Sequence, residues 1–206
     1  MPDEVDATRR HFLIVATGVV GAVGVIFAAV PFIDSMEPSA RALANSGPVD
    51  IDISKIEPGG LVKGRWRGKP IWIVNRPAAV VAALTANDSR LRDPKSQEPQ
   101  QPAYCHNEQR SIKPQTFVVV PICTHLGCIP LYRPRSGDSS IGPNWPGGFH
   151  CPCHGSLYDL AGRVFQNVPA PLNLPVPVHR YLSDSVIRIG ENPAGSSSHW
   201  QGPTTW

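Results

Sequence analysis

The chain has no basic run longer than the pair Arg9 and Arg10, and its 19 Lys and Arg against 16 Asp and Glu leave a formal charge of only +3. Proteins that bind nucleic acid carry clustered positive charge, so we expect no nucleic-acid partner. The sequence has no evident internal repeat. At 206 residues it is long enough to bury an ordinary hydrophobic core, which argues against a miniprotein held together by disulfides.

The composition is rich in the two residues that interrupt regular structure, with 23 proline and 18 glycine residues. Such a composition is typical of many short strands joined by shaped loops, and it disfavours a helical bundle. Alternating or β-branched segments at 49–56, 61–76 and 116–122 predict strands. The segment 61–76 should form a hairpin that turns at Gly68, Lys69 and Pro70. We therefore predict a mainly β fold.

Three further segments complete the expected secondary structure. One short helix is expected at 76–88, and the polar stretch 89–113 should be a long surface excursion. The segment 176–190 resembles a closing hairpin that turns at Ser183 and Asp184.

Residues 12–33 contain no charged side chain and are long enough to cross a bilayer as a helix. Arg9 and Arg10 precede this segment and acidic residues follow it, so the positive-inside rule places the N-terminus in the cytoplasm. The sequence "TRRHFL" at 8–13 also resembles a twin-arginine export signal. A cleaved signal peptide is the alternative, since "ALA" at 42–44 offers a cleavage site. We prefer a retained anchor because the apolar segment exceeds the usual signal-peptide core.

This pattern divides the chain into five parts. They are a cytoplasmic N-terminus (1–11), a transmembrane anchor (12–33), a flexible tether rich in Ala and Ser (34–47), a folded domain (48–190) and a C-terminal tail (191–206).

Four of the five cysteines fall in two short segments, "PICTHLGC" at 121–128 and "FHCPCHGSLYD" at 149–159. Cys123 with His125, and Cys151 with His154, give each segment one thiolate and one imidazole. Four such ligands suit either a tetrahedral zinc site or a [2Fe-2S] cluster in which two histidines replace two cysteines on one iron. Spacing alone leaves both open.

"CTHLGC" together with "CPCHGSLYD" resembles the paired cluster-binding boxes of the Rieske iron-sulfur proteins, specifically the high-potential members of cytochrome bc1 and b6f complexes. The segment "AGRVFQNVPAPLNLPVP" at 161–177 resembles the family's proline loop, and the order of anchor, tether and head is the family's order. The resemblance implies a Rieske fold of antiparallel sheets with a cluster-binding subdomain at about 119–175, and one N-terminal transmembrane helix.

The resemblance also implies roles for individual residues. Cys123 and Cys151 would bind the buried iron of a [2Fe-2S] cluster, and His125 and His154 the outer iron. Cys128 and Cys153 would form a disulfide that joins the two boxes. The hydroxyls of Ser156 and Tyr158 would donate to a cluster sulfide and to a ligand cysteine sulfur, respectively. Both hydrogen bonds would raise the redox potential.

The function implied by the resemblance is that of a quinol–cytochrome c reductase subunit. The cluster would take an electron from ubiquinol and pass it to cytochrome c1, with His154 as the hydrogen-bond partner of the quinol and His125 beside it. Leu126, Pro169 and Pro171 would dock on cytochrome b, and residues 36–47 would be the hinge on which the head moves. The complex would be dimeric and lie in a bacterial inner membrane, with the N-terminal helix in lipid and the head in the periplasm.

Several residues depart from the family's pattern. Val168 stands where the proline loop often has glycine, Leu157 replaces a polar residue, and the segment 129–150 between the boxes is long enough to form an added surface loop. His150 is a weaker ligand candidate than His154 because adjacent residues rarely point at one metal. Cys105 is the odd cysteine and receives no role.

The same residues leave three alternatives to this function. The first is a Rieske subunit of another exported enzyme of the arsenite-oxidase type, which the anchor and tether disfavour. The second is a soluble Rieske ferredoxin or oxygenase domain, which the two disulfide cysteines disfavour. The third is a zinc-binding module without redox function.

Overall fold

The computed structural model describes residues 6–40, 42 and 46–196. The chain forms two compact units, Met1–Ala44 and Asn45–Trp206. The predicted tail at 191–206 is described only as far as residue 196, so both of its tryptophans lie outside the described residues. The predicted tether at 34–47 is likewise described only in part.

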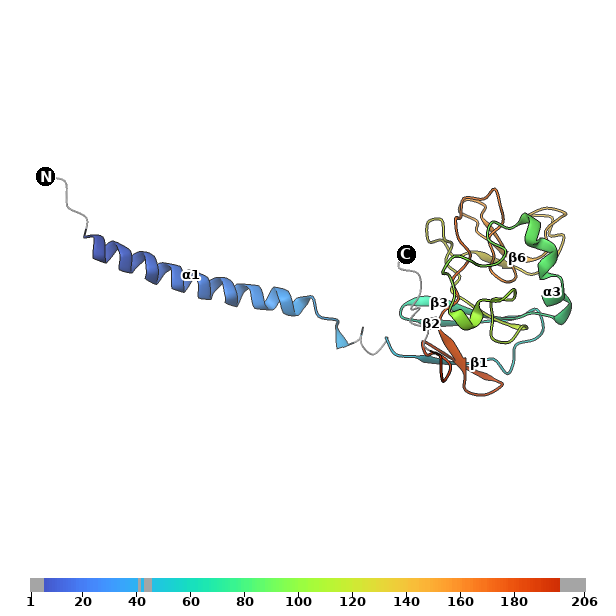
Figure 1. Cartoon of the computed structure of the whole chain (residues 1–206), viewed down its shortest axis with the longest axis horizontal. Helices are drawn as coiled ribbons and strands as arrows, with labels where there is room; N and C mark the ends of the chain where they lie inside the picture. The colour runs from blue at the N-terminus through green and yellow to red at the C-terminus, as the bar shows by residue number, and fades with distance from the viewer. Residues whose placement is uncertain (1–5, 41, 43–45, 197–206) are drawn as a thin grey trace. The chain divides into compact units, whose positions relative to one another are not determined.

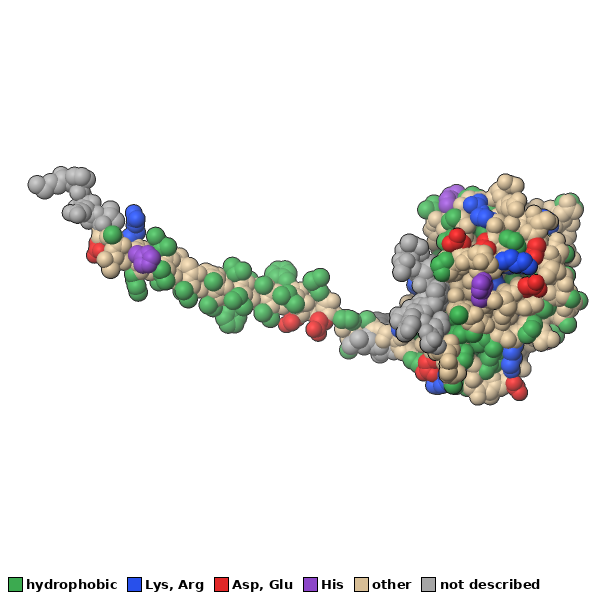
Figure 2. Space-filling view, viewed as in Figure 1, with side chains coloured by type: hydrophobic (Ala, Val, Ile, Leu, Met, Phe, Trp, Pro, Cys, Tyr) green, Lys and Arg blue, Asp and Glu red, His purple; other side chains and the backbone are tan. Residues whose placement is uncertain are grey.

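The first unit is dominated by one long helix, α1 (Ala7–Ser35), which contains the whole predicted anchor. Asp6 caps its start, because the carboxylate accepts hydrogen bonds from the backbone N–H groups of Thr8 and Arg9. The helix is long and apolar enough to cross a membrane, and Figure 2 shows hydrophobic side chains along its surface. It continues to Ser35, so the first residues assigned to the tether are helical.

The second unit contains three antiparallel sheets of three strands each. The first has the order β1 (Val49–Asp52), β9 (Val186–Ile189), β8 (His179–Tyr181). The second has the order β2 (Leu61–Trp66), β3 (Lys69–Asn75), β4 (Thr116–Val119). The third has the order β5 (Leu131–Arg133), β6 (Gly148–His150), β7 (Leu157–Asp159). The prediction of a mainly β fold of antiparallel sheets is confirmed.

The β2–β3 hairpin turns one residue earlier than the sequence analysis placed it. Arg67 and Gly68 have φ values of 49° and 76°, and Lys69 already pairs with Trp66 in the ladder. Two consecutive positive φ values give the tight turn whose twist matches that of the flanking strands. Pro70 fits inside β3 because β4 pairs only with residues from Trp72 onward, so no ladder hydrogen bond is lost there. The closing hairpin of β8 and β9 turns at Ser183 and Asp184 as predicted.

The helix predicted at 76–88 is two short elements instead of one. A single turn of α-helix, α3 (Ala78–Ala82), follows Pro77 and passes into a 3-10 helix, η1 (Leu84–Arg90). The residues of η1 include Thr85, Asn87, Asp88 and Ser89, whose short polar side chains compete with helical backbone hydrogen bonds. This composition explains why the α-helix does not continue.

The prediction of a surface excursion at 89–113 is wrong in its central part. The segment contains a short 3-10 helix, η2 (Ala103–Cys105), and several of its side chains are buried, among them Ser96, Gln100, Gln101, Cys105, Arg110 and Ser111. Arg110 is fully buried, and its guanidinium donates to Gln101 Oε1 and to the carbonyls of Gln100, Ala161 and Gly162. The polar composition gave a wrong prediction because these polar groups form hydrogen bonds with one another inside the domain.

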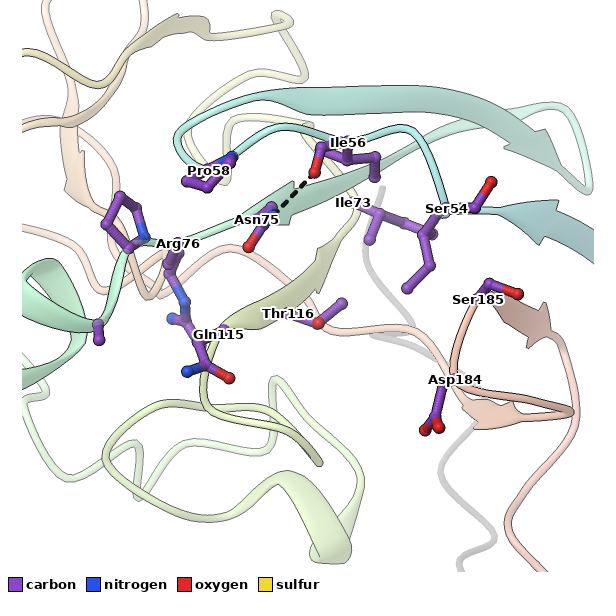
Figure 3. Close-up of a pocket in the computed structure, with 13 residues that line it drawn as sticks. Ser54, Ile56, Pro58, Ile73, Asn75, Arg76, Gln115, Thr116, Asp184 and Ser185 are labelled. Carbon is purple, nitrogen blue, oxygen red and sulfur yellow. Dashed lines mark hydrogen bonds between the residues drawn. The ribbon is translucent and has the colours of Figure 1, made fainter.

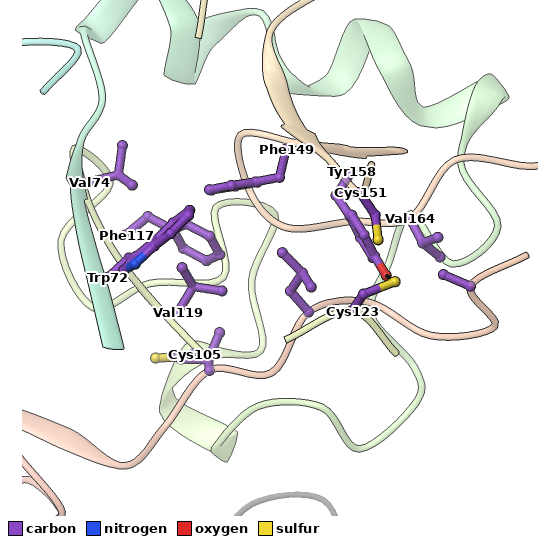
Figure 4. Close-up of a cluster of buried hydrophobic side chains, with 13 residues drawn as sticks. Trp72, Val74, Cys105, Phe117, Val119, Cys123, Phe149, Cys151, Tyr158 and Val164 are labelled. Carbon is purple, nitrogen blue, oxygen red and sulfur yellow. Dashed lines mark hydrogen bonds between the residues drawn. The ribbon is translucent and has the colours of Figure 1, made fainter. Parts of the chain in front are cut away.

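Two clusters of buried side chains form most of the core. One lies between the sheet of β2, β3, β4 and the sheet of β5, β6, β7, and Figure 4 shows Trp72, Phe117 and Phe149 packed there together with Cys123 and Tyr158. The other joins the sheet of β1, β9, β8 to the β2–β4 sheet through Ile51, Ile73 and Ile187. The first cluster therefore continues directly into the sulfur-bearing segments.

A groove of about 670 Å³ opens beside the second cluster (Figure 3). Its lining includes Ile56, Asn75, Arg76 and Asp184, and the side-chain amide of Asn75 donates to the carbonyl of Ile56 at 2.9 Å. No cysteine or histidine is among its lining residues, so it is separate from the metal-ligand candidates.

Candidate metal centre

The two boxes form loops with the same backbone hydrogen bonds. In the loop between β4 and β5, Cys123 N–H donates to Cys128 O at 2.7 Å and Gly127 N–H to Cys123 O at 2.9 Å. In the loop between β6 and β7, Cys151 N–H donates to Ser156 O at 2.8 Å and Gly155 N–H to Cys151 O at 3.0 Å. Each loop therefore holds its first cysteine in the same local geometry.

A glycine closes each of these loops for a conformational reason. Gly127 and Gly155 have φ values of 81° and 75°, a region that residues with a Cβ rarely adopt. No atom lies within 4 Å of a Cβ built on either residue, so the requirement comes from the backbone and not from crowding. The Gly in "THLGC" and in "CHGS" is thus part of the loop design.

The four candidate ligands separate into a buried pair and an outer pair. Cys123 and Cys151 are buried, at 3% and 1% exposure, whereas His154 is exposed and His125 is half-buried. The two imidazole rings lie together, with centroids 4.8 Å apart and planes at 84°. Burial raises the pKa of the Cys151 thiol, so a thiolate at this position needs a cation beside it.

One imidazole nitrogen is available as a metal ligand. His125 Nδ1 is buried and has no hydrogen-bond partner among the described residues. A buried polar atom without a partner is unfavourable unless something else satisfies it. The donor set of two thiols and two imidazoles, with this nitrogen turned inward, fits a metal group bound between the loops.

The remaining two cysteines of the boxes are bonded to each other. Cys128 and Cys153 form a disulfide that joins the two loops, with Cα atoms 6.6 Å apart. The sulfurs of Cys128, Cys151 and Cys153 all lie within 4.8 Å of one another, but only Cys151 among them keeps a sulfur free to bind metal. The disulfide therefore lies directly beside the candidate centre.

Tyr158 on β7 reaches the sulfur of the other loop. Its hydroxyl donates to Cys123 Sγ at 3.2 Å, and Figure 4 shows these two side chains next to each other. The same oxygen accepts the backbone N–H of Thr124 at 3.2 Å. Burial raises the pKa of Tyr158, so the hydroxyl keeps the proton that it donates. The ring is fully buried, which holds the hydroxyl oxygen in place beside Cys123.

A third segment, the predicted proline loop, is fastened to both boxes. Ala170 N–H donates to Ser156 Oγ at 3.1 Å, which leaves the Ser156 proton for another acceptor. Thr124 Oγ1 donates to Leu172 O at 2.7 Å and accepts Leu172 N–H at 3.4 Å. Thr124 is a functional residue that was not predicted from the sequence. Its place between two proposed ligands, in "CTH", was the signal for it.

The proposed docking residues lie on the outside of the same loops. Leu126 is 71% exposed, and Pro169 and Pro171 are exposed on either side of the buried Ala170. Ile129, directly after Cys128, is 52% exposed and extends this apolar surface beyond the predicted residues. These exposed apolar groups lie next to the metal-ligand candidates, and docking of a partner there stays a prediction.

A buried ionic network lies beneath the second box and was not predicted. Asp159 and Arg163 are fully buried and paired at 2.8 Å, and Asp159 Oδ1 also accepts the backbone N–H groups of Ala161 and Arg163. Arg76 donates to Leu160 O at 3.1 Å, and burial lowers its pKa to about 10, so it remains charged at neutral pH. The turn that follows β7 is therefore held rigidly by charged groups.

Two residues that the sequence analysis set aside have structural positions. Cys105 is buried in the first core cluster, and burial raises its pKa to about 12, which makes it an inert thiol. His150 is the last residue of β6 and pairs with Leu131 and Leu157 in the sheet. The predicted loop at 129–150 contributes β5 and β6 to the third sheet, so only its middle part is an insertion.

Comparison with known proteins agrees with this site. Residues 95–179 match the family described as "Rieske [2Fe-2S] domain". The fold, the donor set and this match together define a Rieske protein, whose cofactor is a [2Fe-2S] cluster. The match therefore decides against the zinc alternative. Residues 1–39 match the family described as "Ubiquitinol-cytochrome C reductase Fe-S subunit TAT signal".

Full-length relatives identify the family more closely. The chain is 58% identical over 188 residues to the ubiquinol-cytochrome c reductase iron-sulfur subunit of Allochromatium vinosum, covering 91% of each chain. It is 45% identical over 196 residues to that of Blastochloris viridis, covering 93% of this chain and 98% of the relative. The chain therefore belongs to the family of ubiquinol-cytochrome c reductase iron-sulfur subunits. The twin-arginine signal match and the apolar helix α1 make it a membrane-anchored member.

Among solved structures, a chain of "Hyperthermophilic respiratory Complex III" aligns with a TM-score of 0.44 and 28% identity. The alignment covers 84% of this chain and 98% of that one. The family assignment itself follows from the sequence relatives.

Proposed function

We propose that this chain is the subunit of a cytochrome bc1 complex that takes an electron from ubiquinol and delivers it to cytochrome c1. The observation that carries the proposal is the division of the site into an inner and an outer pair of ligands. Two thiols are buried, and two imidazoles lie with their ring centroids 4.8 Å apart on the outer side. Such a site can exchange an electron with a partner that touches the imidazoles. The family membership names the reaction.

Four residues would hold the cofactor. Cys123 and Cys151 supply the buried thiolates, and His125, through Nδ1, and His154 supply the imidazoles. When bound, the [2Fe-2S] cluster supplies a one-electron acceptor with a potential of roughly −150 to +300 mV in this class. The Tyr158 and Ser156 hydroxyls act on that potential, since hydrogen bonds to sulfur stabilise the more negative reduced form.

His154 is proposed as the group that meets the quinol. Its exposure allows the imidazole to accept a hydrogen bond from a quinol hydroxyl and then the proton, at the ring nitrogen not used for metal binding. His125 lies beside it, and its inward Nδ1 leaves Nε2 as the outer nitrogen. These two residues are the proposed catalytic groups because proton removal must accompany electron removal from the quinol.

Leu126, Pro169 and Pro171 form the proposed contact with cytochrome b. All three are exposed; Leu126 belongs to the first ligand loop, and the two prolines belong to the proline loop that is hydrogen-bonded to both ligand loops. A protein that covers them would also bury the imidazoles and exclude water. After the electron is accepted, the head must leave this surface to reach cytochrome c1. A dimeric complex is part of the proposal.

The anchor and tether give the proposed location and motion. Arg9 and Arg10 before the apolar helix support a cytoplasmic N-terminus in a bacterial inner membrane, with the head in the periplasm. Residues 36–47 are the proposed hinge, although residues 41 and 43–45 lie outside the described part of the chain. Prolines introduced into this segment should slow cytochrome c1 reduction and leave the cluster spectrum unchanged. Normal turnover in such variants would exclude a hinge.

The first test of the function is low-temperature electron paramagnetic resonance on membranes that carry the protein, reduced with ascorbate alone. A rhombic signal that changes when a quinol-site inhibitor is added is the expected result. A signal that appears only with dithionite would indicate a low-potential carrier and contradict quinol oxidation. No signal under either reductant would contradict the cluster itself.

A further inference from the structure

Three departures from the family's sequence pattern meet in one hydrophobic cluster. Its buried members are Leu91, Trp145 and Phe165, and Ile141, Leu157 and Val168 pack against them. Trp145 and Ile141 belong to the β5–β6 connection at 134–147, which we call the brace. We propose that the brace positions the proline loop and the second box around the [2Fe-2S] cluster. Trp145 is its main positioning residue.

Trp145 is fixed by the brace and by β5. The indole is 3% exposed, and its Nε1–H donates to Arg133 O at 3.0 Å. Its backbone N–H donates to Gly142 O at 3.1 Å, and its carbonyl accepts Gly137 N–H at 2.8 Å. A buried indole with its polar atom satisfied is a rigid contact surface, so the brace is an ordered element and not a loose surface loop.

The partner of Trp145 is directly connected to the second box. The rings of Trp145 and Phe165 lie 6.0 Å apart at 41°. Phe165 N–H donates to Leu157 O at 3.1 Å, and Leu157 is the neighbour of Ser156. Arg90 joins the same unit, because its guanidinium lies 5.0 Å from the Phe165 ring centroid and donates to Asn144 O in the brace at 3.0 Å.

Val168 connects the brace to the proline loop. Its side chain packs against the hydrophobic cluster that contains Trp145 and Phe165. It also packs against the core cluster that contains Cys123, Cys151 and Tyr158. Its carbonyl accepts a hydrogen bond from Arg92 Nη2 at 3.2 Å. A glycine here would make neither apolar contact, so the valine and the brace are structurally coupled.

The path from the brace reaches a hydroxyl that acts on the cluster. Ala170, two residues after Val168, donates its N–H to Ser156 Oγ at 3.1 Å. If the brace no longer supports Val168, the proline loop should open more often and the Ser156 hydroxyl should lose its fixed orientation. This inference rests on the proposed function, in which Ser156 donates to the cluster.

The test compares two tryptophans in the full-length protein with its cluster assembled. Trp145→Ala removes the brace contact, whereas Trp66→Ala removes an equally well-buried indole, 8% exposed, whose Nε1–H donates to Gly47 O at 3.1 Å in the other core cluster. The first measurement is hydrogen–deuterium exchange at the Ala170 amide in the proline loop. Its neighbours Pro169 and Pro171 have no N–H and give no exchange signal. The midpoint potential of the cluster is the second measurement.

We expect Trp145→Ala to raise the exchange rate at Ala170 by about tenfold, equivalent to about 1.4 kcal/mol in local opening, and to lower the midpoint potential. Trp66→Ala should change neither, although it lowers the melting temperature. Trp145→Phe should restore most of the protection, since an aromatic ring still faces Phe165.

If Trp145→Ala keeps the wild-type exchange rate at Ala170 and the wild-type midpoint potential, the proposed role of the brace is wrong. Equal changes in Trp145→Ala and Trp66→Ala would also overturn it, because the effect would then be general destabilisation. If Trp145→Ala does not fold, Ile141→Ala gives the same comparison with a smaller change. A wild-type protein without a [2Fe-2S] signal would contradict the proposed function instead, so the two failures are distinguishable.

Discussion

Tyr158 donates a hydrogen bond of 3.2 Å to Cys123 Sγ across the two loops of the metal centre. The same oxygen accepts the backbone N–H of Thr124, and the Thr124 hydroxyl, 3.3 Å away, is a second possible partner for the Tyr158 proton. Because the ring is fully buried and its pKa is raised, solvent does not compete for this proton. One hydroxyl thus links the second box to the first at the sulfur atom itself.

Tyr158→Phe should keep the cluster and lower its midpoint potential. A hydrogen bond that favours the reduced form by about 1.4 kcal/mol raises a one-electron potential by about 60 mV, so a fall of this order is expected. A redox titration followed by electron paramagnetic resonance measures it. Tyr132→Phe is the matched control, since that hydroxyl donates to a backbone carbonyl, Gly59 O, at 2.8 Å and not to a cysteine sulfur. An unchanged potential in Tyr158→Phe would remove this hydroxyl from the tuning of the cluster.

Thr124→Val should loosen the proline loop without changing the size of the side chain. The substitution leaves the carbonyl of Leu172 without its 2.7 Å donor, and an unsatisfied partly buried carbonyl costs about 1 to 3 kcal/mol. The melting temperature of the purified protein measures the loss. Thr124→Ser keeps the hydroxyl and should remain close to wild type. Equal stability of the valine and serine variants would contradict the assigned hydrogen bonds.

Asp159→Asn should destabilise the head strongly. It leaves the fully buried Arg163 with Asp88, also at 2.8 Å, as its remaining carboxylate, and removing one partner of a buried ion pair costs about 3 to 5 kcal/mol. The exposed pair of Lys113 and Asp184, at 2.7 Å, is the control, and Asp184→Asn should cost far less than Asp159→Asn because solvent screens an exposed ion pair. Denaturant unfolding of both variants compares the two, and similar losses would show that burial does not decide the cost.

His179 should make the protein less stable in mild acid. Burial lowers its pKa from 6.5 to about 4, and Nδ1 lies 2.8 Å from Pro177 O. Between these two pH values the unfolded chain binds a proton that the folded chain does not, so stability falls as the pH decreases from 6.5 to 4. The full loss is about 3 kcal/mol, and above pH 6.5 it is absent. Melting temperatures across this range should show a shallower acid slope for His179→Gln than for wild type, and parallel slopes would contradict the assignment.

Much of the candidate site could be predicted from local sequence because its chemistry is local. The spacing of Cys123 to His125 and of Cys151 to His154 lies within single loops, and each loop is closed by its own backbone hydrogen bonds and glycine. The anchor is equally local, since an uninterrupted apolar segment needs no tertiary partner to form a helix. These features depend on neighbours along the chain.

The errors arose where distant segments decide the environment. Arg110 is polar by composition, yet it is buried because carbonyls of Ala161 and Gly162 accept its protons. Thr124 was overlooked because its partner, Leu172, is far along the sequence. The position of the β2–β3 turn was misjudged by one residue because Arg67, and not only Gly68, adopts positive φ.

The sequence by itself determined the apolar helix and the family and predicted a ligand set, because residue type and short spacing specify metal donors and apolar length directly. Only the tertiary structure decided how these donors are held. It brought Trp145 against Phe165, Ala170 against Ser156 and Tyr158 against Cys123. The physical reason is that burial and hydrogen bonding between distant segments depend on how the chain packs, and residue type alone does not encode which carbonyl or ring a side chain will meet.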